Sequence, residues 1–192
     1  MTEHPIIFTG PMVLAILADL KTQTRRVIVP QPTKGVVTEK YRPGEHLWVK
    51  ETTHMLPCGT GVYSIDSVNV LERRPEYSFL DTDLARWWYS KRVCPSIFMP
   101  RWASRLTLEI TEVRVQRVQD ISNGDAIAEG AYVGEATICK TERGPHPREG
   151  FEALWDSLNA KRGRRFGECG FGWDVNPWVW ALTFRRIANA DA

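Results

Sequence analysis

The chain has 192 residues, of which 43% are hydrophobic and 25% are charged, a composition typical of a folded domain and not of a disordered or fibrous chain. The net charge of +2 is too small to indicate a histone-like binder of polyanions, although 18 of the 25 cations are arginine, which suits planar contacts with phosphates and bases. Because no apolar run reaches the roughly 20 residues of a membrane-spanning helix and no signal-peptide pattern opens the sequence, we expect a cytoplasmic protein.

An amphipathic helix is the first predicted element. Its apolar residues recur with the spacing of one helix face, and they are Val13, Ile16, Leu17 and Leu20. Thr9-Gly10-Pro11 is a start signal, so we expect the helix over residues 11–20. The β-branched run Thr24 to Val29 predicts a strand that ends at Pro30, and an alternating strand follows at residues 47–50.

The middle of the chain is less regular. Residues 52–100 are interrupted by proline and glycine, and we interpret them as an insertion with a hairpin and a short helix near 84–90. From Arg105 the apolar residues alternate and then slip by one near Thr111-Glu112, which predicts one long strand with a bulge or bend.

Two helices and a strand are predicted after it. Ser122 and Asp125 resemble a capping box, and Gly130 is a natural stop, so Glu129 is expected at a helix end. Helical spacing returns at residues 151–158, and a final strand is expected from 177 to 186. The sum predicts an α+β fold over a single domain, 1–192: a small mixed β-barrel, partly closed, with about three helices around it.

The segment around Lys21 is the most informative for function. It resembles the ASCH-domain family, a PUA-like small β-barrel fold with the signature G-x-K-x-x-E-x-R. The corresponding positions are Asp19, Lys21, Thr24 and Arg26, of which Lys21 and Arg26 match and Asp19 replaces the glycine. Threonine in place of the glutamate is similar to the bacterial N(4)-acetylcytidine amidohydrolases of this superfamily, which carry Lys-x-x-Thr and a later A-x-x-E segment. Ala126 to Glu129 matches that segment.

Other blocks are similar to phage and prophage ASCH-type proteins, and they span most of the chain outside residues 53–94 and 131–147. They are residues 5–12, 47–52, 99–105, 126–130, 154–157 and 176–180. The resemblance implies an amidohydrolase that acts on an acylated cytidine or a related modified pyrimidine, with Lys21, Thr24 and Glu129 as catalytic residues.

Threonine, lysine and glutamate can supply the nucleophile, proton shuttle and oxyanion stabiliser that amide hydrolysis needs. With an ordinary pKa of about 10.4, Lys21 as general base costs about 4.6 kcal/mol at pH 7 unless burial lowers that pKa. Two mechanisms of hydrolysis are therefore possible. Either Glu129 holds the proton while Lys21 activates Thr24 as nucleophile, or Glu129 is the base on a water while Lys21 and Thr24 bind the oxyanion.

A simple salt bridge between Lys21 and Glu129, with Thr24 an ordinary strand residue, is the structural alternative. Arginines and tryptophans suited to holding a phosphate and stacking a base are the candidate substrate-binding set, with Glu51 as a second carboxylate. The set is Arg26, Trp48, Glu51, Arg101, Trp102 and Arg105. The structural alternative is that the tryptophans belong to the core and the arginines are solvated at the surface. Trp178 and Trp180 are expected to pack inward.

Two rivals to the hydrolase remain: a non-catalytic module that binds RNA or modified DNA, and an ASCH-type ribonuclease. The partner is then a modified pyrimidine nucleoside or a single-stranded nucleic acid, and no cofactor is required. The cysteines form no C-x-x-C pair, and His54 with Cys58 makes at most half a metal site, so we predict no metal.

Overall fold

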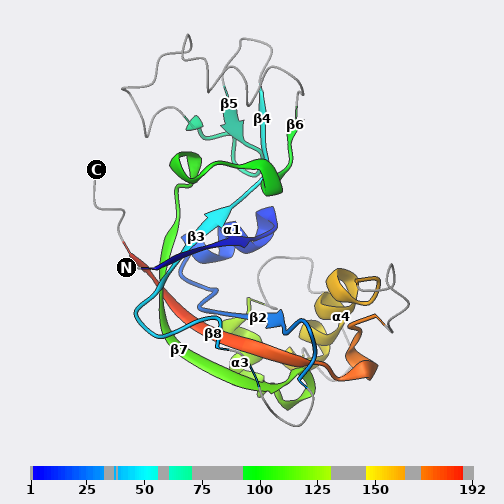
Figure 1. Cartoon of the computed structure of the whole chain (residues 1–192). Helices are drawn as coiled ribbons and strands as arrows, with labels where there is room; N and C mark the ends of the chain where they lie inside the picture. The colour runs from blue at the N-terminus through cyan, green and yellow to red at the C-terminus, as the bar shows by residue number, and fades with distance from the viewer. Residues whose placement is uncertain are drawn as a thin grey trace. The chain divides into compact units, whose positions relative to one another are not determined.

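The computed structural model describes residues 2–32, 37, 39–55, 61–70, 93–130, 146–162 and 170–187 (Figure 1). Its contacts divide the chain into two compact units. The first unit contains Met1–Leu17, Glu45–Glu109 and Arg186–Ala192. The second unit contains Ala18–Gly44 and Ile110–Arg185. Each unit is described below by itself.

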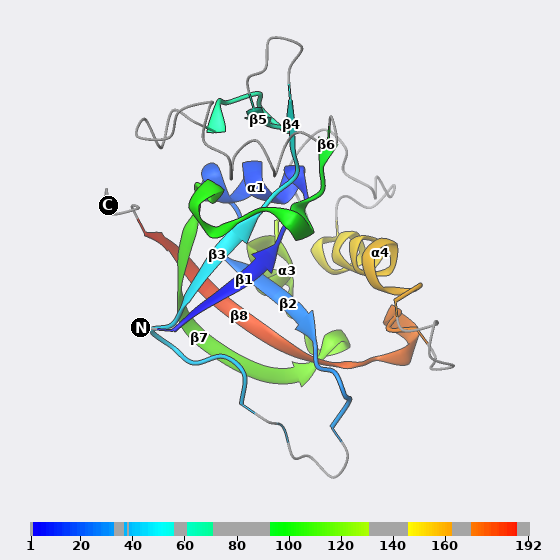
Figure 2. The ribbon, with the colours of Figure 1, turned by 45° about the horizontal axis from the view of Figure 1, so that its top comes forward.

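The main sheet has five strands in the order β1-β3-β7-β8-β2. In that order they are Glu3–Ile7, His46–Lys50, Thr107–Arg117, Trp178–Ile187 and Gln23–Val27. β1 runs parallel to β3, as the blue and cyan arrows of Figure 2 show, whereas β3 pairs with β7 and β2 with β8 in antiparallel fashion. This mixed sheet with its helices is the α+β class that the sequence predicts, and β2 is a terminal strand of the order.

The first unit also holds helix α1 (Gly10–Leu17) and a small sheet in the order β5-β4-β6. These strands are Gly61–Tyr63, Thr53–Met55 and Val93–Cys94, followed by the short 3-10 helices η2 (Ser96–Phe98) and η3 (Arg101–Ala103). The antiparallel pair β4–β5 confirms the hairpin predicted within residues 52–100. The helix predicted at 84–90 lies outside the described residues. A buried apolar cluster underlies this sheet: Tyr63, Val70, Cys94, Met99 and Ala103.

The first helix ends three residues earlier than predicted. It stops at Leu17, and Asp19 has a positive φ of 56°, a left-handed conformation that no α-helix continues through. Leu20 therefore lies beyond the helix and is 53% exposed, so its assignment to the apolar helix face is wrong. Asp19 stands where the resembled signature has glycine, and it adopts the backbone conformation that glycine favours.

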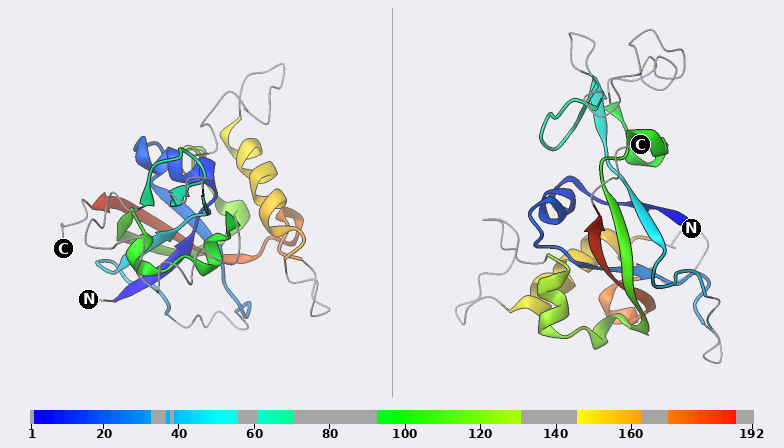
Figure 3. Two further views of the ribbon diagram at one scale, coloured as in Figure 1. Left: turned by 90° about the horizontal axis from the view of Figure 1, so that it is seen from above. Right: turned by 90° about the vertical axis from the view of Figure 1, so that its left-hand side faces the viewer.

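The second unit is built on helices α3 (Asn123–Ala128) and α4 (Pro147–Asn159), which pack together (Figure 3). The short 3-10 helices η4 (Val118–Asp120) and η6 (Trp173–Val175) complete it. Its buried apolar cluster is Val118, Ile121, Ala126, Phe151, Trp155, Trp173 and Val179. Glu129 is the C-cap of α3 and Gly130 has a φ of 78°, so the predicted end of this helix is confirmed.

The start of α3 gives the first testable prediction. The hydroxyl of Ser122 accepts a hydrogen bond of 3.0 Å from the backbone N–H of Asp125, which caps the helix as the sequence predicts. Ser122→Ala is expected to lower the free energy of unfolding by about 1 kcal/mol, measured by urea denaturation. Ser157→Ala, on the exposed side of α4, is the control and should change it by less than about 0.5 kcal/mol. Equal losses in the two variants would contradict the capping role.

The last strand places its two tryptophans differently. Trp180 is 6% exposed and packs edge-on against Tyr41, with ring centroids 6.0 Å apart, which confirms it as core. Trp178 is half-buried and not core as expected, and the Arg117 guanidinium lies over its ring, 4.5 Å from the centroid. Within the described ranges, none of the helices combines the length and the apolar character that crossing a membrane requires.

Candidate functional site

The side chain of Lys21 is completely buried in the second unit. Its Nζ donates hydrogen bonds of 2.7 Å to the carbonyl of Gln23, to the carbonyl of Glu129 and to Oε2 of Glu129. An ammonium has three donors, so these contacts account for one acceptor per proton. The contact with Oε2 joins residues that are 108 positions apart. The predicted meeting of Lys21 and Glu129 is therefore confirmed.

The carboxylate of Glu129 is held at both oxygens. Its side chain is 4% exposed, Oε2 accepts from Lys21, and Oε1 accepts from Nη1 of Arg25 at 3.1 Å. The Arg25 side chain has no exposed surface. Two cations therefore enclose the Glu129 carboxylate, and little of its surface is open to a water.

Backbone hydrogen bonds bring the two segments together. The N–H of Thr22 donates to the carbonyl of Ala128 at 2.8 Å, so the chain just before β2 bonds to the C-terminal end of α3. Lys21 then bonds the next carbonyl, that of Glu129. Helix C-terminal carbonyls lack partners within the helix and favour a cation nearby. Lys21 thus also caps α3, which is the structural role that the salt-bridge alternative predicts.

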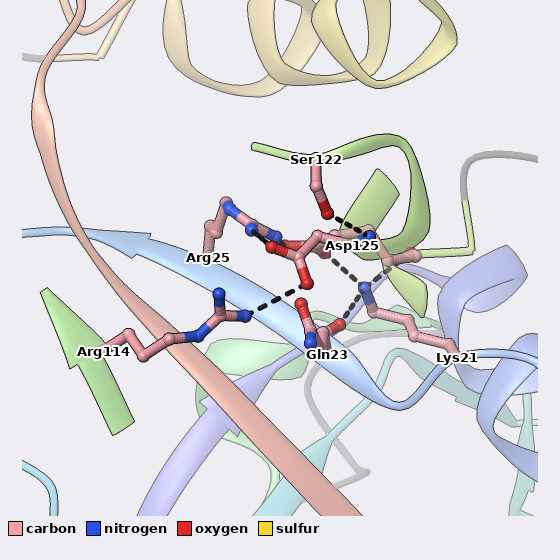
Figure 4. Close-up of polar contacts among 7 residues, drawn as sticks. Lys21, Gln23, Arg25, Arg114, Ser122 and Asp125 are labelled. Carbon is pink, nitrogen blue, oxygen red and sulfur yellow. Dashed lines mark hydrogen bonds and ion pairs between the residues drawn. The ribbon is translucent and has the colours of Figure 1, made fainter. Parts of the chain in front are cut away.

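A second carboxylate extends the network (Figure 4). Asp125 Oδ2 accepts from Nη2 of Arg25 at 2.9 Å, and Oδ1 accepts from Nη2 of Arg114 at 3.1 Å. Arg25 comes from β2 and Arg114 from β7, the two neighbours of β8 in the sheet. Ala181 on β8, the strand between them, is in register with Arg25. Asp125 therefore ties α3 to two strands.

Burial and charge act on the protonation of these groups. Desolvation lowers the pKa of Lys21, the charge and hydrogen bond of Glu129 oppose this, and the charges of Arg26 and Arg25 add to it, so that the pKa is lowered overall. For Asp125, desolvation alone would raise the pKa. Hydrogen bonds from Arg114 and Gln23 and the charge of Arg25 outweigh that effect and lower the pKa.

Thr24 is buried, 4% exposed, and lies in β2 in register with Leu182. Side chains alternate along a strand, so Thr24 faces away from Gln23 and Arg25. Lys21 Nζ nevertheless bonds the carbonyl of the peptide group that joins Gln23 to Thr24. Among the described residues, Thr24 makes no hydrogen bond with Lys21 or Glu129, so contact between its hydroxyl and the pair remains a prediction.

Two of the predicted substrate-binding residues, Arg105 and Glu51, bind each other in the first unit. Arg105 Nε and Nη2 donate to Oε1 and Oε2 of Glu51 at 2.8 and 2.7 Å, and Nη1 donates to Asp66 at 2.6 Å. The guanidinium also lies 4.0 Å from the ring centroid of Tyr63. A phosphate at Arg105 would have to displace two carboxylates. This geometry is typical of a structural ion pair.

The remaining first-unit candidates are nearer to solvent. Arg101 donates to both carboxylate oxygens of Glu3 at 2.8 and 2.9 Å, with 44% of its side chain exposed. Its guanidinium lies 5.9 Å from the ring centroid of Trp48, and Lys50 Nζ lies 5.3 Å from it. Trp102 packs against the apolar cluster of this unit and is half-buried.

Arg26 belongs to the second unit, with the catalytic candidates. Desolvation lowers its pKa, and the charge of Glu129 acts in the opposite direction. The basic segment Lys161 to Arg165 is described only as far as Arg162, and Cys58, Cys139 and Cys169 lie outside the described residues. Among the side chains that the structure describes, no group of His, Cys, Asp and Glu is suited to holding a metal ion.

Sequence reasoning missed the role of Asp125. It assigned Asp125 only to the cap of α3, whereas the structure shows it bound by Arg25 and Arg114. One signal was present, because Asp125 and Glu129 are four residues apart and so share a helix face. The partners of that acidic face come from strands about 100 residues and 11 residues away, and no local pattern identifies them.

The chain is similar to two solved structures. One is an ASCH domain from Lactobacillus crispatus, at 12% identity and a TM-score of 0.48, covering 96% of this chain and 79% of that one. The other is a protein from Enterococcus faecalis of the family DUF984, at 8% identity and a TM-score of 0.47, covering 97% and 81%. No protein-family model and no curated protein matches the sequence. The likeness concerns the fold and says nothing of activity.

Proposed function

We propose that the chain is an ASCH-type amidohydrolase that removes the acyl group from the exocyclic amine of an acylated cytidine or a related modified pyrimidine. The observation that carries the proposal is the buried 2.7 Å contact between Lys21 Nζ and Glu129 Oε2. It joins the Lys-x-x-Thr segment to the A-x-x-E segment, which are the two motifs that resemble the acetylcytidine hydrolases. An enclosed lysine–carboxylate pair is also where perturbed proton affinities concentrate in enzymes.

The contacts favour Lys21 as the base. Glu129 has a cation at each oxygen and its side chain is only 4% exposed, so its carboxylate is poorly placed to activate a water. Burial lowers the pKa of Lys21, and a proton passed to Glu129 along their hydrogen bond would leave a neutral pair, the form that a dry site prefers. The neutral amine then has the lone pair that a base needs.

The proposed reaction requires the Thr24 hydroxyl to come within reach of Lys21 Nζ, which in the structure bonds the adjoining carbonyl of Gln23. Lys21 then takes the hydroxyl proton while the Thr24 oxygen attacks the acyl carbon. The carbon–nitrogen bond of the amide breaks, and Lys21 gives that proton to the departing amine of the pyrimidine. A water then attacks the Thr24 ester, losing a proton to Lys21, and Thr24 recovers a proton as the carboxylic acid leaves. The net reaction consumes one water and yields the deacylated pyrimidine nucleoside and the carboxylic acid.

The test incubates the purified protein with N(4)-acetylcytidine, with other acylated pyrimidine nucleosides and with labelled single-stranded RNA, and follows the products by chromatography. Release of cytidine in wild type, lost in Glu129→Gln and retained in Lys40→Arg, supports the proposal. Lys40 is an exposed residue of the same unit. Intact acylated nucleosides after incubation with a folded wild type would overturn it, and RNA cleavage would favour the ribonuclease.

A second candidate is a non-catalytic module for single-stranded nucleic acid. The observation in its favour is Trp48, whose ring has the cations of Lys50 and Arg101 near it. An aromatic ring with flanking cations can stack a base and bind its phosphate. Binding of the RNA without turnover, weakened by Trp48→Ala, would support this candidate.

A further inference from the structure

We infer that Asp125 is a positioning residue of this site: by holding Arg25, it allows Glu129 to accept the proton of Lys21. The inference rests on the proposed function. Asp125 is one helical turn before Glu129, and a single guanidinium bridges the two carboxylates. Arg25 Nη1 lies 3.1 Å from Oε1 of Glu129, and Nη2 lies 2.9 Å from Oδ2 of Asp125.

The charges of the four central groups balance. Lys21 and Arg25 are cations, Glu129 and Asp125 are anions, and the side chains of the first three are at most 4% exposed. When the proton moves from Lys21 to Glu129, Arg25 remains paired with Asp125. Without Asp125, Glu129 would be the one carboxylate bonded to Arg25 among the described residues, and its single negative charge would face both Lys21 and Arg25. Transfer of the Lys21 proton to Glu129 would then leave the buried Arg25 without a bonded anion, which is unfavourable.

The other charged groups around Lys21 and Glu129 are consistent with a pairing of Arg25 with Asp125. Arg26 on β2 acts on Lys21 from the same strand as Arg25, and the charge of Arg162 acts on Arg26 in turn. Arg114 on β7 pairs with Asp125, and it lies 3.7 Å from Glu112, whose side chain is 56% exposed. Gln23 also bonds Asp125. Asp125 therefore has two further donors besides Arg25, which keep it ionised.

The test compares the pH dependence of kcat in wild type and in Asp125→Asn, with N(4)-acetylcytidine as substrate. In wild type the proton moves within the pair, so kcat should change little between about pH 6 and pH 8. In Asp125→Asn the free amine forms only by proton loss to solvent, so kcat should be about tenfold or more lower at neutral pH and should rise with pH. KM should stay within about twofold.

Three variants separate this role from simple loss of structure. Arg25→Met combined with Asp125→Asn removes the uncompensated cation and should restore the flat profile, and Asp125→Glu should retain it. Asp174→Asn, the same change at an exposed site of this unit, should behave as wild type. An active wild type whose kcat profile is unchanged in Asp125→Asn would overturn the inference alone. An inactive, folded wild type would overturn the proposed function and the inference with it.

Discussion

Lys21→Arg is expected to abolish hydrolysis of acylated cytidine as thoroughly as Lys21→Ala. Arginine keeps the positive charge but does not lose its proton in a protein, so it cannot accept the proton of Thr24. General-base catalysis is worth about 10²- to 10⁴-fold, and kcat should fall by that range in both variants. Steady-state kinetics with N(4)-acetylcytidine measures the effect, with Lys40→Arg as the matched control at an exposed lysine.

The opposite result has a definite meaning. If Lys21 bound the developing oxyanion, arginine would still supply donors and Lys21→Arg would keep measurable turnover while Lys21→Ala lost it. Glu129 would then be the base, despite the two cations on its oxygens. Thr24 distinguishes the versions as well, because Thr24→Ala is severe only if its hydroxyl is the nucleophile, and Thr24→Ser should remain active.

Glu129→Ala is expected to lower the free energy of unfolding at pH 7 by about 3–5 kcal/mol, because it leaves the buried cations Lys21 and Arg25 without a shared anion. Burial lowers the folded-state pKa of Lys21 below its ordinary 10.5, so between the two pKa values the unfolded chain binds more protons. The contribution of Lys21 to the free energy of unfolding therefore rises with pH between its folded-state pKa and its unfolded-state pKa. Without Glu129 the pKa falls further, and the interval extends to lower pH.

Urea denaturation at pH 7 and pH 9 measures both effects. The loss caused by Glu129→Ala should be smaller at pH 9 than at pH 7, since the neutral amine of Lys21 is cheaper to bury than its ammonium. Glu39→Ala is the control, because Glu39 is 59% exposed and pairs only with the exposed Arg42 among the described residues. A loss below about 1 kcal/mol at both pH values would show that the pair is not an electrostatic centre of the fold.

Local patterns predicted the elements near the site well. The helical spacing of the apolar residues Val13, Ile16 and Leu17 predicts α1. Ser122 and Gly130 predict where α3 begins and ends. These signals act over a few residues, where backbone sterics and capping decide the outcome. The wrong assignment of Leu20 to the first helix also has a local cause. The left-handed conformation of Asp19 ends the helix although the apolar periodicity continues to Leu20.

Charge pairing was harder to predict. A guanidinium suits a phosphate and a carboxylate equally, and the sequence does not say which partner the fold supplies. Arg105 was a candidate for phosphate, and the structure pairs it with Glu51 and Asp66. Arg25 is likewise paired with two carboxylates, those of Glu129 and Asp125. Lys21 and Glu129 were paired correctly because two motifs resembled one family, and not because any local pattern joins residues 108 positions apart.

The most direct measurement is a single-turnover reaction of wild type with N(4)-acetylcytidine, quenched in acid and analysed by peptide mass spectrometry. We expect an acetyl ester on the peptide that contains Thr24, formed as cytidine is released and lost as acetate appears, and absent from Thr24→Ala and from Lys21→Arg. Cytidine release with no acetyl group on Thr24 at any time point, or full activity in Thr24→Ala, would contradict a threonine nucleophile activated by the buried Lys21–Glu129 pair.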